Sequence, residues 1–98
     1  MIYDNFIQLT QKETPPDELN GIHLAIWYIM KDNWDMAHNI TQDINTETAS
    51  WIHAYLHRQE GDISNAHYWY HKAGKKAYTG NLKPELDDII KTVFNKEL

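Results

Sequence analysis

Apolar residues recur every three or four positions along almost the whole chain, and this spacing restricts the fold more than any other feature of the sequence. The segment from Leu86 to Phe94 is a clear case, because its large apolar residues share one helical face and its charged residues occupy the other. Only three prolines and four glycines interrupt the pattern along the chain. The sequence therefore predicts an all-α protein.

Breaks in this pattern give the boundaries of six predicted helices. The expected helices cover residues 3 to about 12, about 16 to 31, 34 to about 44, 45 or 46 to about 59, about 63 to 73, and 84 to 96. Proline in the first turn is expected to start the second and the last of them. Residues 75–83 are expected to form the longest loop.

The chain also repeats itself, because a shift of 29 residues aligns two segments without a gap. Ala25 then falls on Ala54, and Ala37 falls on Ala66. A small residue in the middle of a helix lets a second backbone approach closely. The repeat therefore predicts two antiparallel helix hairpins, with these alanines where the helices of each hairpin cross.

The two hairpins resemble the tetratricopeptide repeat. The second unit carries Gly61-Asp62-x-x-x-Ala66-x-x-x-Tyr70-x-x-Ala73, and the first carries Gly21-x-x-Leu24-Ala25-x-x-Tyr28 followed by Ala37. The resemblance implies a right-handed stack of antiparallel helix hairpins, with an N-terminal helix and a C-terminal capping helix. It implies a single domain, residues 1–98, with repeat units at about 19–45 and 47–74 and the capping helix at 84–96.

A longer motif begins at His53 and reads HAYLHR-x-EGD-x-x-NA-x-YWY. It is similar to a motif in a group of short bacterial proteins of uncharacterised function. This second resemblance implies relatives of the chain and implies no activity.

Charge and composition argue against several classes of partner and cellular location. The net charge of -5, with only nine Lys and Arg residues, argues against nucleic acid as a partner. The chain has no cysteine, no apolar stretch long enough to span a membrane, and no basic start before an apolar run. We therefore expect a cytoplasmic protein that binds no membrane.

Four histidines form the most conspicuous chemical motif. His53 and His57 lie four residues apart, as do His67 and His71, so each pair shares one face of a helix. Zinc binds imidazole nitrogens at about 2.0–2.1 Å, and facing pairs of this kind supply such ligands. The alternative is that His53 and His57 fill core positions of the hairpin, with His67 and His71 turned about 100° from the contact line. The second reading is preferred, and no metal or other cofactor is expected.

Catalytic motifs of other kinds are missing from the sequence. There is no cysteine nucleophile, neither Ser50 nor Ser64 lies in a Gly-x-Ser-x-Gly turn, and there is no HExxH motif or phosphate-binding glycine loop. We therefore expect a protein that is not an enzyme.

The resemblance to the tetratricopeptide family also implies a binding surface. In that family the inner face of the first helix of each unit lines a concave groove. The first unit here gives Ile22, Ile26, Ile29 and Met30, which we expect the N-terminal or the C-terminal helix to cover, and the second unit gives Trp51, Tyr55, Arg58 and Gln59. Trp, Tyr and Arg are the residue types that dominate binding hot spots, so these positions are expected to stay accessible. The implied function is an interaction module for a protein or peptide segment. Either a monomer or a homodimer fits the sequence.

Overall fold

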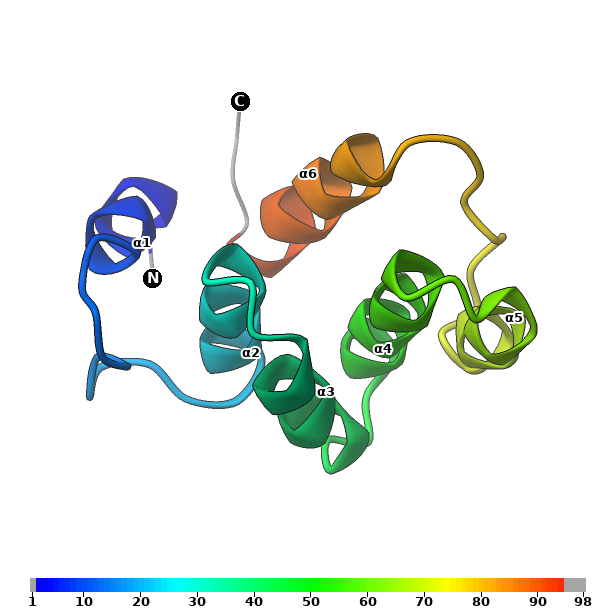
Figure 1. The fold of residues 1–98 in the computed structure, drawn as a ribbon, viewed down its shortest axis with the longest axis horizontal. Coiled ribbons are helices and arrows are strands. Elements are labelled where there is room, and N and C mark those ends of the chain that lie inside the picture. The colour runs from blue at the N-terminus through cyan, green and yellow to red at the C-terminus, as the bar shows by residue number, and fades with distance from the viewer. Residues whose placement is uncertain (1, 95–98) are drawn as a thin grey trace.

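The computed structural model describes residues 2–94, and within that range it contains six α-helices and no strand (Figure 1). The helices are α1 (Tyr3–Leu9), α2 (Gly21–Met30), α3 (Trp34–Gln42), α4 (Glu47–Gln59), α5 (Ile63–Lys72) and α6 (Leu82–Val93). The prediction of an all-α protein is confirmed. None of these helices has the length and apolar character needed to cross a membrane.

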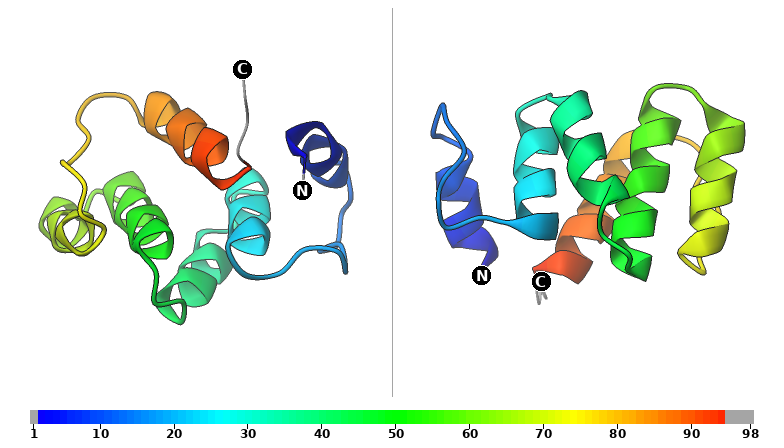
Figure 2. Two further views of the ribbon diagram at one scale, coloured as in Figure 1. Left: turned by 180° about the vertical axis from the view of Figure 1, so that it is seen from behind. Right: turned by 90° about the horizontal axis from the view of Figure 1, so that it is seen from below.

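Helices α2 to α5 stand side by side in a curved row, each running opposite to the one before it (Figures 1 and 2). The contacts between them are most extensive within the pairs α4–α5 and α2–α3, and α3 also packs on α4. Helix α6 crosses the inner side of this row and contacts α4 and α2. Helix α1 is attached at the N-terminal end, where the Trp27 indole donates to the carbonyl oxygen of Leu9 at 2.9 Å.

The predicted crossing residues lie where the repeat places them. Ala25 and Ala37 are completely buried in the α2–α3 pair, and Ala54 and Ala66 are completely buried in the α4–α5 pair. A methyl side chain at each point lets the two backbones approach closely. The antiparallel hairpins are therefore held by contacts that the sequence repeat encodes.

The turns of the two hairpins are also equivalent. Asp32 has φ 60° and Gly61 has φ 89°, so both adopt the left-handed conformation that ends a helix. The next residue then caps the following helix: the Asn33 side chain accepts from the backbone N–H of Met36, and Asp62 does the same for Asn65. An aspartate therefore takes the place of glycine in the first turn without changing its geometry.

The start of α2 differs from the prediction. Proline at the first turn was expected to open this helix near residue 16, but α2 begins at Gly21. Pro15 is disfavoured in a helix because another proline follows it, and the N–H of Leu19 bonds to the carbonyl of Pro16 in a separate turn. Residues 10–20 are consequently the longest connection between described helices, and the expectation that 75–83 is the longest was wrong.

Helix α6 folds back onto the row of helices. It begins at Leu82, which places Pro84 inside the first turn, where a missing N–H leaves no bond unmade. Ile89, Ile90 and Phe94 are buried against the inner side of the row. The apolar face of this helix is therefore covered within the same chain. Residues 95 and 96 of the predicted helix lie outside the described residues.

Candidate metal centre

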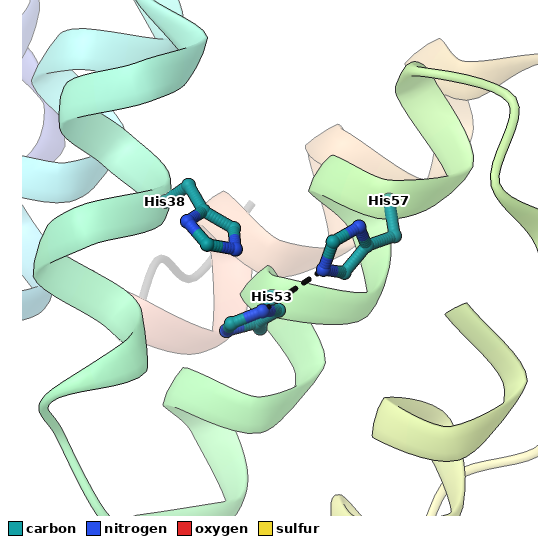
Figure 3. Close-up of side chains that lie close together, drawn as sticks. All are labelled: His38, His53 and His57. Carbon is teal, nitrogen blue, oxygen red and sulfur yellow. Dashed lines mark hydrogen bonds between the residues drawn. The ribbon is translucent and has the colours of Figure 1, made fainter. Parts of the chain in front are cut away.

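Three histidines converge where α3 meets α4. His38 comes from α3, and His53 and His57 come from adjacent turns of α4, with the three rings facing a common point (Figure 3). One ring nitrogen from each lies within 4.8 Å of the others. His53 and His57 are buried, and His38 is half-buried.

Neighbouring tryptophans fix two of the three rings. The Trp34 ring stacks on the His38 ring at a centroid distance of 4.7 Å, and the Trp34 Nε1–H donates to the carbonyl oxygen of Leu56 at 2.7 Å. The His53 ring stacks on that of Trp69 from α5, with centroids 3.8 Å apart and planes 17° from parallel. The histidines are therefore oriented by three successive helices.

The hydrogen bonds around His57 assign its protons. His57 Nδ1 lies 2.6 Å from a carboxylate oxygen of Glu60, so Nδ1 carries a proton and donates it. In the neutral ring this leaves Nε2 with a lone pair, and that atom lies 3.0 Å from Nε2 of His53. The Nε2–H of His53 therefore donates to His57.

His53 is held in its neutral form. Burial lowers its pKa to about 3, and electrostatic interactions with the neighbouring His38, His57 and Lys72 act in the same direction. With the proton on Nε2, the Nδ1 atom carries a lone pair, and it is a buried nitrogen with no hydrogen-bond partner among the described residues. A buried polar atom without a partner costs stability, and Nδ1 of His53 is such an atom.

The spacing of the nitrogens is close to that of a metal site. Two nitrogens bound to one tetrahedral zinc ion at roughly 2.0–2.1 Å lie about 3.3–3.4 Å apart. The Nε2 atoms of His53 and His57 are already 3.0 Å apart, and His38 adds a third ring nitrogen to a set that lies within 4.8 Å. The Glu60 contact to His57 Nδ1 is the carboxylate–histidine pair that commonly orients a metal ligand.

The cluster is also reachable from solvent. The three histidines line a pocket of about 520 Å³ that continues between the end of α3 and the start of α5. Its remaining wall consists of Gln42, Asp43, Asn65, Tyr68 and Trp69. An ion can therefore enter the site without opening of the helix row.

His67 and His71 do not join this cluster. Ala66 and Tyr70 of α5 are buried toward α4, which leaves both histidines exposed on another face of the helix. His67 instead borders a separate pocket beside Arg58. The structure therefore does not bring together the four histidines of the alternative metal reading, whereas His53 and His57 point into the interior and His67 and His71 are turned away, as the preferred reading expected.

The third histidine was missed from the sequence. His38 lies four residues after Trp34, a spacing that puts the two rings on one helical face, and the 29-residue shift pairs it with His67. Neither pattern indicates that α3 packs on α4 with this face. The distance between the two hairpins is a tertiary feature, and it decides which histidines meet.

The predicted binding residues are mostly covered. Trp51 is 2% exposed and Tyr55 is 3% exposed, so the expectation that they remain accessible is wrong. The reason is α6: its Glu85 accepts hydrogen bonds from the Trp51 indole and from Nε of Arg58. Of the four residues, only Gln59 is exposed.

Comparison of the chain with protein families, with curated proteins and with solved structures gave no match.

Proposed function

We propose that the protein binds a divalent transition-metal ion, with zinc as the best fit, through His38, His53 and His57. The observation that carries the proposal is the convergence of three ring nitrogens within 4.8 Å at the head of a solvent-accessible pocket. Glu60, which accepts from His57 Nδ1, supports the proposal as an orienting carboxylate.

The ligand type selects the class of metal. Imidazole nitrogens suit zinc, copper, iron and nickel, whereas magnesium and calcium prefer oxygen ligands. A metal ligand must carry a lone pair, so the depressed pKa of His53 keeps that ring ready to bind at neutral pH. Binding by Nε2 requires that the His53 proton move to Nδ1 and that the hydrogen bond from His53 to His57 be replaced by the bonds to the metal.

The protein is purified without a histidine tag and freed of metal. It is then titrated with zinc, and calorimetry records the binding. We expect one ion per chain and a raised melting temperature, since a ligand at about 100 times its Kd stabilises the native state by about 2.7 kcal/mol. His38→Ala is the first variant, because this half-buried residue can be truncated with little effect on the core. It should bind zinc at least about tenfold more weakly.

His67→Ala and His71→Ala are the matched controls, because both residues are histidines of the same chain and both are exposed away from the cluster. They should bind zinc as the wild type does. Equal zinc affinity in the wild type and in His38→Ala would overturn the proposed site. Weaker zinc binding in the control variants alone would place the metal site on α5 instead.

We also propose, as a second candidate function, a tetratricopeptide-like interaction module that binds an amphipathic helix. It is supported by the inner face of α4, where Trp51 and Arg58 hold Glu85 of such a helix, α6. A partner helix with an acidic residue at the position of Glu85 would use the same contacts after displacing α6.

A labelled peptide of residues 82–94 tests this second function by fluorescence anisotropy with the full chain. Saturable binding that is weakened in a Glu85→Ala peptide supports an exchangeable groove. No binding of the unmodified peptide would mean that α6 is a permanent part of the core, and the interaction function would lose its site.

A further inference from the structure

The three-histidine cluster provides fewer ligands than a closed metal site needs. Structural zinc sites are nearly always bound by four protein ligands, whereas sites with three protein ligands keep a fourth position for water or another small molecule. Among residues 2–94, the group that contains His38, His53 and His57 includes no fourth histidine and no carboxylate.

The nearest carboxylates have other partners. Glu60 Oε2 accepts from Nδ1 of His57 at 2.6 Å. The other nitrogen of that ring, Nε2, is the one that faces His53. Asp62 caps α5, where its side chain accepts from the backbone N–H of Asn65 at 3.3 Å. Both groups would have to leave these bonds to bind an ion at the cluster.

The open side of the cluster faces the pocket. The pocket of about 520 Å³ is lined by all three histidines, and it has room for several waters at about 30 Å³ each. Asp43, Asn65 and Tyr68 add polar groups to its lining. A ligand that enters from solvent therefore reaches the metal and finds hydrogen-bond partners around it.

The charge of the site indicates the class of that ligand. Three neutral imidazoles leave the full +2 charge of the ion uncompensated, so a small anion or a metal-bound hydroxide is favoured there. Zinc bound in this way lowers the pKa of its water to about 7. Asp43 is the one carboxylate among the residues that line this pocket.

We infer that the metal keeps one coordination position open toward the pocket, and that water, hydroxide or a small monodentate anion occupies it exchangeably. This inference rests on the proposed metal-binding function. It distinguishes a site that can bind and polarise a small ligand from one that only links α3 to α4.

Cobalt(II) is the probe, because its visible absorption bands depend on the number and type of its ligands. The full-length protein is loaded with cobalt and titrated with sodium azide. We expect the bands to change in a saturable way as azide replaces the water. A parallel pH titration without azide should change the bands near neutral pH, as the metal-bound water loses its proton.

The variant Asp43→Asn tests the main alternative, in which the Asp43 carboxylate binds the metal as its fourth ligand. If the metal is open, this variant binds cobalt with the wild-type spectrum and still responds to azide. A spectrum altered by Asp43→Asn before azide is added, together with wild-type bands that ignore azide, would overturn the inference.

The two proposals fail in different ways. Bound cobalt with azide-insensitive bands overturns the open position alone and leaves a closed metal site. A protein that shows no cobalt bands at all overturns the metal-binding function and the open position with it.

Discussion

The indole Nε1–H of Trp51 donates a hydrogen bond to Oε2 of Glu85 at 3.0 Å, across 34 positions of the chain. The same carboxylate accepts from the Tyr70 hydroxyl and, through Oε1, from Nε of Arg58 at 2.9 Å. Glu85 is completely buried. One side chain of α6 therefore links α4 and α5, and it does so on the face of α4 where the sequence predicted a binding surface.

Glu85→Ala should destabilise the protein strongly. The substitution leaves the Arg58 guanidinium, the Trp51 N–H and the Tyr70 hydroxyl without their shared acceptor. Removing one member of a buried ion pair typically costs about 3–5 kcal/mol, because the other charge stays buried and uncompensated. Urea unfolding followed by tryptophan fluorescence measures the change in the free energy of unfolding.

Asp87→Ala on the same helix is the control for that measurement. Asp87 pairs with Lys83 at 3.1 Å, but the two side chains are 48% and 81% exposed. An exposed pair of this kind contributes about 0–1 kcal/mol. Similar losses in the two variants would contradict the assignment of Glu85 as the link between the helices.

Stability should fall in alkaline solution because Tyr70 and Tyr78 ionise less readily in the folded chain than in the unfolded one. Burial and the neighbouring Asp88 raise the pKa of Tyr78 from 10.0 to about 12, and burial with Glu85 raises that of Tyr70 further. The unfolded chain therefore loses these protons first, and stability that is complete below pH 10 is lost as the pH rises toward 12. Unfolding free energies measured across this window test the sign.

Tyr78→Phe isolates one contribution to that pH dependence. The variant removes the hydroxyl that donates to Asp88 at 2.8 Å and keeps the ring that stacks near Trp51. Above pH 10, the free energy of unfolding of this variant should fall less steeply with pH. The difference in slope should correspond to about one proton at most. An unchanged slope would show that Tyr78 ionises as it does in the unfolded chain.

Ala66→Leu should push the α4–α5 hairpin apart. Ala66 is completely buried where these helices cross, and a larger side chain there must strain its neighbours. Overpacking of this kind usually costs about 1–3 kcal/mol. The melting temperature should fall by several degrees, whereas Ser64→Leu, at an exposed position of the same helix, should change it little. Equal melting of both variants would contradict the close crossing.

Local sequence signals account for much of this fold. Helical spacing gave the helices, the alanine repeat gave the hairpins, and the side-chain caps Asn33, Thr46 and Asp62 begin α3, α4 and α5. These features depend on residues within a few positions of one another. The packing of α6 across α4 depends on residues far apart in the chain, so the sequence pattern left open what fills the groove.

The candidate site shows the same division. The interior direction of His53 and His57 follows from their helical face, but the contribution of His38 depends on how one hairpin packs on the next. Glu85 carried a usable signal, because it lies four residues before Ile89 and therefore on the apolar face of its helix. An acidic residue on that face requires a buried partner, and Arg58 supplies it.

Glu60→Gln should weaken zinc binding without changing the fold. Glu60 is the partner of His57 Nδ1, and it is partly exposed, so its loss costs little packing. Removing an orienting carboxylate of this kind lowers metal affinity by about 10- to 100-fold. Calorimetry compares this variant with Glu13→Gln, an exposed residue outside the cluster. Equal zinc affinity in the wild type, Glu60→Gln and Glu13→Gln would mean that the Glu60 contact has no part in metal binding.

The full chain should remain monomeric across a roughly hundredfold concentration range in light scattering. The reason is that Ile89, Ile90 and Phe94, the apolar face of α6, are already buried within the same chain. A chain that ends at Asn81 loses this cover and exposes Trp51, Tyr55 and the Arg58 guanidinium together. We expect that truncated chain to aggregate or to lose its fixed side-chain packing, which near-ultraviolet circular dichroism detects. A truncated chain that stays folded and monomeric would contradict the capping role and would leave the groove of α4 open for a partner helix.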